Sequence, residues 1–323
     1  ISGTAKRKTD SHQADFEEQW QFRILATESI LSSDWNGEIF LRGKNVDQSY
    51  LMQTLAIKHA QIPQNTMDVA VNSHWRSAKL QTASFETAVS KEESNGLGTL
   101  TIHGNLTRLD DGWALGFLPE QFGDETYTRE SAPMVRVRWL DKTKKIAWAI
   151  TDLPIKDLHY AVNNIFTSAS PIRAELQRVQ PKGLIREASA LVAADDVFAI
   201  QSAVAQIESV SIDESQKLPG VTDLDAVILF NEHAGSMHFD QRKTVQLSSN
   251  RWLANPLEIT LLKGTIDWLQ HDSGVTFSTS GLQTIVESFD FKSKGSANFS
   301  DPTNLQLDLI SYFDAGDLSH FSK

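Results

Sequence analysis

The chain has 323 residues, 40% of them hydrophobic, and is therefore long enough to bury a substantial core. Its formal net charge of −11 argues against nucleic acid as a partner, because binding phosphates requires clustered Lys and Arg. It contains no cysteine, which excludes disulfides, thiol nucleophiles and thiolate metal sites. We expect an internal piece of a larger protein, because the chain starts without Met and stops inside an apparent helix.

Apolar and polar residues alternate along most of the chain. Val135–Trp139 alternates with arginines, a charged stretch follows at Asp141–Lys145, and alternation resumes in Ile146–Ile150. This period of two is typical of strands with one buried face, and the charged stretch predicts a hairpin turn. The same pattern recurs in the second half of the chain, around Val227, Met237, Leu257, Ile266, Val275, Phe289, Phe299 and Leu305.

Helical spacing is rare. The longest predicted helix covers residues 154–166, with Asp152 as its N-cap and Pro154 in its first turn. Shorter helices are predicted after Asp47 and near Asp314–Phe321, each following a strand. The stretch Ser168–Pro171 after the longest helix suggests a boundary, which gives two blocks at residues 1–170 and 171–323.

These patterns predict a mainly β fold, in which a long, mostly antiparallel sheet has short helices at its margins. Counting by alternation gives about fifteen to twenty strands, whose apolar face three short helices cannot cover. The sheet therefore either closes on itself as a sandwich or barrel, or leaves part of its apolar face open. An open apolar face of that size would be an interaction site.

No catalytic pattern is found. The chain has no Gly-x-Ser-x-Gly elbow, and Gly96 and Gly98 lack the third glycine of a dinucleotide loop. The histidines do not show metal-ligand spacing, and the adjacent carboxylates Asp110 and Asp111 point to opposite faces if they lie on a strand. We therefore expect a protein that is not an enzyme and needs no cofactor or metal.

Several short sequence motifs are more specific than the period-two alternation. Leu176–Ile185 contains Pro-Lys-Gly before a hydrophobic pair, and Leu218–Gly220 leads into the apolar strand Leu224–Phe230. Phe313–Leu318 and, more loosely, Trp148–Pro154 look like strand-to-helix endings. Together these motifs resemble those of the large YhdP-type envelope proteins of the AsmA-like superfamily, best from about residue 97 onward.

That resemblance implies a fold and a function that spacing alone does not show. Proteins of this type have an inner-membrane helix, absent here, and a long periplasmic body that is a repeating β-groove with an apolar inside. They are implicated in moving phospholipid between the inner and outer membranes. The expected partners are therefore phospholipid acyl chains, both membranes through other parts of the protein, and possible envelope proteins. The resemblance implies no catalytic residues that could be assigned to positions of this sequence.

The candidate groove residues come from the strongest alternating strips. If the predicted hairpin pairs in register, six apolar side chains form one strip, and a second strip lies farther along. The candidates are Val135, Val137, Trp139, Ile146, Trp148, Ile150, Val275, Phe277, Phe289 and Phe291. The alternative is that they are ordinary core of a closed β-sandwich, a structural or protein-binding module of the envelope. A carbohydrate-active enzyme on a β-scaffold is a third, weaker hypothesis.

Overall fold

The computed structural model describes residues 2–8, 17–27, 34–47, 66–90, 99–123, 125–126, 132–158, 177–178, 180–193, 199–214, 219–249, 255–271, 274–286, 289–298 and 306–314. Within them the chain forms nineteen strands and short helical segments at residues 155–158 and 177–178. The strand pairs with a resolved register are all antiparallel, as in the β1–β2 and β18–β19 pairs. The predicted mainly β, antiparallel fold is confirmed.

The chain divides into two compact units. The first comprises residues 1–148 and 157–175, and the second comprises residues 149–156 and 176–323. Strand β10 (Lys145–Pro154) therefore contributes its first residues to one unit and its last residues to the other. The boundary predicted after residue 170 stays a prediction.

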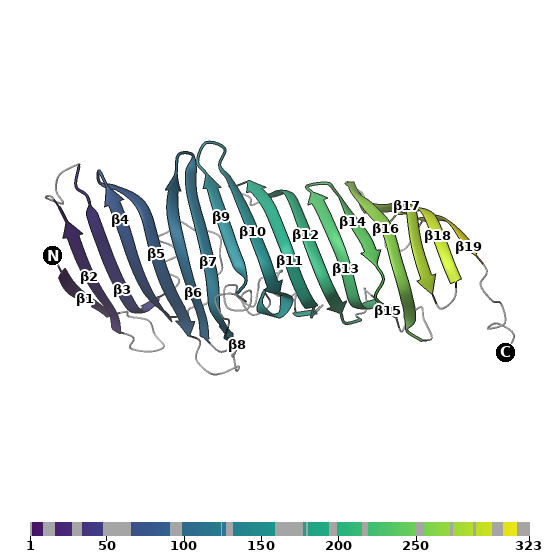
Figure 1. Ribbon diagram of the computed structural model, residues 1–323, viewed down its shortest axis with the longest axis horizontal. Helices are drawn as coiled ribbons and strands as arrows, with labels where there is room; N and C mark the ends of the chain where they lie inside the picture. The colour runs from purple at the N-terminus through teal and green to yellow at the C-terminus, as the bar shows by residue number, and fades with distance from the viewer. Residues whose placement is uncertain are drawn as a thin grey trace. The chain divides into compact units, whose positions relative to one another are not determined.

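In the first unit, consecutive strands pair in chain order (Figure 1). Strand β7 pairs with both β8 and β9. The strands are β1 (Ser2–Lys8), β2 (Glu17–Ala26), β3 (Gly37–Asp47), β4 (Thr66–Arg76), β5 (Lys79–Ser90), β6 (Thr99–Leu109), β7 (Gly112–Gly123), β8 (Glu125–Thr126) and β9 (Met134–Leu140).

The second unit has the same sequential plan (Figure 1), with one short strand inserted. Strand β16 pairs with both β14 and β15, and β13 also pairs with both. The strands are β11 (Lys182–Ala193), β12 (Ala199–Ile212), β13 (Gly220–Asn231), β14 (Ala234–Gln241), β15 (Val245–Ser248), β16 (Leu257–His271), β17 (Gly274–Val286), β18 (Phe289–Asn298) and β19 (Gln306–Asp314).

Alternation places apolar side chains on one face of each sheet, because successive residues of a strand point to opposite faces. Directly paired residues share a face, so the register decides which side chains become neighbours. A small buried cluster in the second unit shows the result, with Ala226, Phe239 and Leu262 packed together across β13, β14 and β16. Ile207, Met237 and Ile266 pack partly buried against this cluster.

The turns behave as the sequence predicts in the clearest cases. Residues 141–144 form the turn between β9 and β10, and the two strands pair. Asp110 and Asp111 form the turn between β6 and β7 and do not lie on a strand. The in-register pairing of Val135–Trp139 with Ile146–Ile150 stays a prediction, since β10 spans both units.

The predicted N-cap at Asp152 is wrong. Strand β10 continues to Pro154, and the helix begins at Ile155 and is described through Leu158. Asp152 lies inside the strand with a φ of 53°, and its carboxylate accepts a hydrogen bond from Arg186. The rest of the helix predicted for residues 154–166, and the helices predicted after Asp47 and near residues 314–321, lie outside the described residues.

Candidate functional site

The apolar face of the first unit contains an uninterrupted cross-strand row. The register β1–β2–β3–β4–β5–β6–β7–β9 brings eight residues into line, one from each strand. They are Gly3, Phe22, Leu41, Val71, Phe85, Gly104, Phe117 and Val135. All of these except Gly104 are only partly buried. The six apolar side chains of the row therefore pack against one another while keeping part of their surface accessible.

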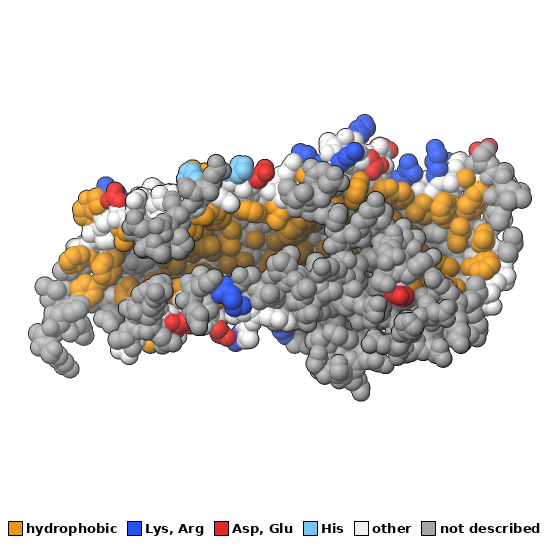
Figure 2. All heavy atoms as spheres, turned by 180° about the vertical axis from the view of Figure 1, so that it is seen from behind, with side chains coloured by type: hydrophobic (Ala, Val, Ile, Leu, Met, Phe, Trp, Pro, Cys, Tyr) orange, Lys and Arg blue, Asp and Glu red, His pale blue; other side chains and the backbone are white. Residues whose placement is uncertain are grey.

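A matching row crosses the second unit, through β11, β12, β13, β14, β16, β17, β18 and β19. It consists of Ala190, Ala203, Phe230, Gly235, Trp268, Phe277, Ala297 and Leu307. The exposed fraction of the side chains differs between the two ends of the row, from the buried Ala190 at 6% to Leu307 at 61%. We call the faces that contain these two rows the apolar faces of the two units. Figure 2 shows that hydrophobic side chains gather on part of the molecular surface.

Strand β9 places its three predicted groove residues on the apolar face of the first unit. Val135 pairs with Phe117, Val137 with Leu115 and Trp139 with Trp113. Val135 and Val137 are half-buried, and Trp139 is 43% exposed. Ile146, Trp148 and Ile150 share one face of β10 by alternation and are also half-buried.

The predicted residues of the second unit also share its apolar face, but they differ in accessibility. Phe277 pairs with Trp268, and Phe291 pairs with Thr284, which in turn pairs with Leu262. Phe277 is 37% exposed, whereas Phe289 is only 7% exposed and packs with Phe291 at a ring-centroid distance of 6.2 Å. Val275 and Phe291 are half-buried. Phe289 is therefore core, and Phe277 offers a surface that a ligand can touch.

The opposite face of the second unit is not purely polar. Val204 pairs with Leu229 there, and both side chains are about two-fifths exposed. Val227, two residues before Leu229 on β13, points to the same side. Apolar exposure alone therefore does not distinguish the two faces. Among the described residues, the eight-strand row on the apolar face consists of apolar residues and glycine, whereas the row through Val204 and Leu229 continues into Ser236 and Asp267.

Sequence reasoning missed the end of the apolar face in the first unit. Arg108 pairs with Trp113, and Trp113 with Trp139, so these residues form the row that follows Leu106, Leu115 and Val137. The guanidinium of Arg108 lies over the Trp113 ring, 5.5 Å from its centroid. The alternation of β6 places Arg108 on the same face as Leu106. Only the register shows that Arg108 stands beside Trp113 at the end of the apolar face.

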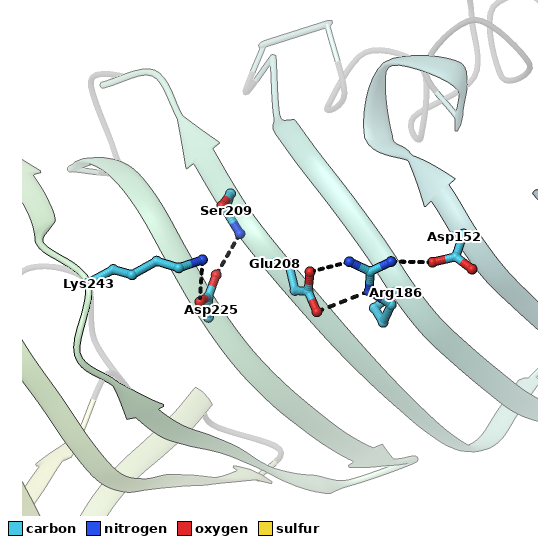
Figure 3. Close-up of polar contacts among 6 residues, drawn as sticks. All are labelled: Asp152, Arg186, Glu208, Ser209, Asp225 and Lys243. Atoms are coloured by element: carbon cyan, nitrogen blue, oxygen red, sulfur yellow. Dashed lines mark hydrogen bonds and ion pairs between the residues drawn. The ribbon is translucent and has the colours of Figure 1, made fainter. Parts of the chain in front are cut away.

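Charged groups of the second unit form ion pairs between neighbouring strands (Figure 3). Arg186 donates two hydrogen bonds to Glu208, at 3.0 and 2.6 Å, and one to Asp152 at 2.6 Å. The hydrogen bond with Glu208, followed by that with Asp152, raises the pKa of Arg186 above its usual range. The hydrogen bond from Arg186 lowers the pKa of Glu208. A guanidinium held by two carboxylates has a structural role.

Beside this group, Asp225 stabilises an irregular point in the sheet (Figure 3). Ser209 has a φ of 49° at a register shift between β12 and β13, and its N–H donates to Asp225 Oδ1 at 2.7 Å. Lys243 lies 3.4 Å from the other carboxylate oxygen. The first unit contains the same arrangement, because Asn45 has a φ of 53° and its N–H donates a hydrogen bond to the carboxylate of Asp68. Such bulges bend strands and increase their twist.

A hollow of about 660 Å³ lies on the first unit, and its lining mixes charged, polar and apolar groups. Arg23, Glu38 and Phe40 belong to the lining and alternate with the residues of the apolar face. The hollow therefore opens mainly on the opposite face. Among the described residues, no group of three or more His, Asp or Glu side chains could hold a metal ion.

A comparison with protein families agrees with these features. The model of the YhdP protein family matches residues 4–323, which is nearly the whole chain. The chain belongs to the YhdP family. This is an envelope family of the lipid-transport type, and the match assigns no catalytic activity.

No curated protein and no solved structure shows significant similarity to the chain. In the described part of the chain, no helix is both long enough and apolar enough to cross a membrane. Membership of the YhdP family therefore gives the functional class, and the residues that carry the function have to be argued from the structure.

Proposed function

We propose that the apolar faces of the two units bind the acyl chains of phospholipids, in a periplasmic segment that guides lipid between the inner and outer membranes. The observation that supports this is the pair of eight-strand rows, whose large apolar side chains stay partly exposed. In a closed sandwich such rows would pack against a second sheet and lose their accessibility. Membership of the YhdP family supports the same class of function.

The energetics fit a ligand without specific polar contacts. Each methylene that leaves water contributes about 0.8 kcal/mol, so several methylenes on a continuous apolar row bind appreciably without a hydrogen bond. Contacts of this kind are equivalent along a row, which would allow a chain to shift from one position to the next. The alternative is the structural or protein-binding module with a closed core.

The proposal is tested by photo-crosslinking in cells, with a photoreactive residue placed at Phe277 or at Leu229. The two positions belong to the same unit and have similar exposure, 37% and 41%, but lie on opposite faces. We expect phospholipid adducts at Phe277 and far fewer at Leu229. Equal capture at both positions, or none at Phe277, would contradict the proposal.

Charge tolerance supplies a second test, with Phe277→Asp compared with Phe289→Asp. Phe289 is 7% exposed, so an unpaired carboxylate there should lower the free energy of unfolding by several kcal/mol. At the exposed Phe277 the same change should leave the melting temperature nearly unchanged and reduce lipid crosslinking at Val275, on the same strand. If Phe277→Asp unfolds the protein as Phe289→Asp does, Phe277 belongs to a closed core.

A further inference from the structure

The strongest unexplained feature of the apolar face in the first unit is the row at its end, Arg108–Trp113–Trp139. It comes from the last part of β6, the first part of β7 and the last part of β9, next to the turns at residues 110–111 and 141–144. On the same three strands, the row before it is apolar, with Leu106, Leu115 and Val137. One cation and two indoles therefore border the apolar surface.

Arg108 differs from its neighbour Arg138 in its partners. Arg138 lies on the opposite face, where its Nη2 atom is 3.0 Å from each of the two Asp111 carboxylate oxygens. Among the described residues, no carboxylate pairs with Arg108, whose guanidinium lies over the Trp113 ring. A guanidinium that lies over an aromatic ring keeps its in-plane N–H groups available for an anion.

We propose that Arg108, held over Trp113, binds the phosphate of a phospholipid whose acyl chains lie on the apolar face, with Trp139 next to Trp113 on the paired strand β9. This rests on the proposed function. Arginine presents paired N–H groups that match a phosphate, and tryptophan suits a boundary between apolar and polar surroundings. An amphiphile with an anionic head and an apolar tail complements a cation at the end of apolar rows.

If Arg108 binds phosphate, the affinity for an amphiphile should depend on its headgroup. Binding by the apolar rows alone would not give this dependence. The probes are n-dodecylphosphocholine and n-dodecyl maltoside, which have the same dodecyl tail, but only the first carries a phosphate. Each is titrated as a monomer into the whole chain, and binding is measured by calorimetry. Arg108→Gln should weaken binding of n-dodecylphosphocholine about five- to tenfold, the scale of an exposed charge-assisted hydrogen bond. Binding of the maltoside should not change.

Arg138→Gln is the matched control, because it removes the same charge from the opposite face of a nearby strand. It should leave the affinity of both amphiphiles unchanged. Arg108→Lys keeps the charge but loses the planar fork and should recover only part of the phosphate preference. Circular dichroism melting should show that Arg108→Gln is folded, since its side chain is exposed.

Each outcome separates this inference from the function on which it rests. If both amphiphiles bind and Arg108→Gln changes neither, or weakens both equally, the phosphate site is wrong while the apolar face stands. An equal loss of n-dodecylphosphocholine binding in Arg138→Gln also overturns the site. If inorganic phosphate alone binds with the same dependence on Arg108, the site is one for free phosphate and the proposal fails. If neither amphiphile binds the unmodified chain, the proposed function itself fails.

Discussion

Glycines inside strands bring neighbouring backbones close together at particular points of the sheet. Gly295 in β18 has a φ of +149°, and a Cβ there would collide with the carbonyl oxygen of Asp308 on β19. Gly281 in β17 is a matched case without this constraint, because a Cβ there would meet nothing within 4 Å. The two positions separate backbone strain from the general effect of replacing glycine.

We expect Gly295→Ala to lower the free energy of unfolding by at least about 1–3 kcal/mol, because it combines a strained φ with a backbone clash. Gly281→Ala should have little effect or raise stability slightly, since alanine restricts the unfolded chain more than glycine does. Urea denaturation of both variants measures the difference. Similar midpoints for the two would show that β18 and β19 do not approach as described.

At the scale of elements, polar side chains connect neighbouring strands where the ladder is irregular. Arg186 lies at the register shift between Ile185 and Glu187 in β11 and bonds to both β10 and β12. Its partner Glu208 directly precedes Ser209, whose N–H bonds to Asp225 on β13. Four successive strands, β10 to β13, are thus linked by polar contacts beside their backbone ladders.

Glu208→Gln should lower stability at about pH 7, and the difference from the unmodified chain should fade toward about pH 3. The pKa of Glu208 is lowered in the folded state, so its contribution is present above its unfolded pKa and is lost as pH falls through the folded pKa. We expect a small effect, because both partners are accessible to solvent. Urea midpoints at the two pH values test this, with Glu187→Gln as the control, and a pH-independent difference would contradict it.

At the scale of the whole molecule, two sheet-built units each present one apolar face. The carboxylates highlighted in Figure 3 are bound to basic groups or backbone N–H groups, and no potential metal cluster occurs in the described ranges. General acid–base catalysis needs ionisable groups that converge on one bond, and this arrangement supplies scaffold contacts instead.

We therefore predict no turnover of ester, glycoside or phosphate substrates by the purified chain. Chromogenic substrates of each class, assayed with the unmodified protein, measure this directly. Reproducible hydrolysis that disappears on substitution of a single Asp, Glu, His or Ser would overturn the prediction and point to a site built from distant residues.

The sequence by itself determined the strands and the face on which their side chains lie. Val135–Trp139 lies in a strand as predicted and residues 141–144 form the following turn, while the groove role of Val137 and Phe277 stays a prediction. The strand could be predicted because period-two alternation is a local property of the chain that follows directly from strand geometry.

Only the tertiary structure decided what depends on distant partners. Phe277 and Phe289 stand in equally alternating segments, yet one is accessible and the other is core, because exposure depends on which residues the neighbouring strands bring alongside. The sequence around Asp152 predicts a helix N-cap. In the structure Asp152 lies in β10, and its carboxylate accepts a hydrogen bond from Arg186, 34 positions away. Arg108 likewise lies beside Trp113 because the strand register pairs the two residues, and no local sequence pattern encodes that register.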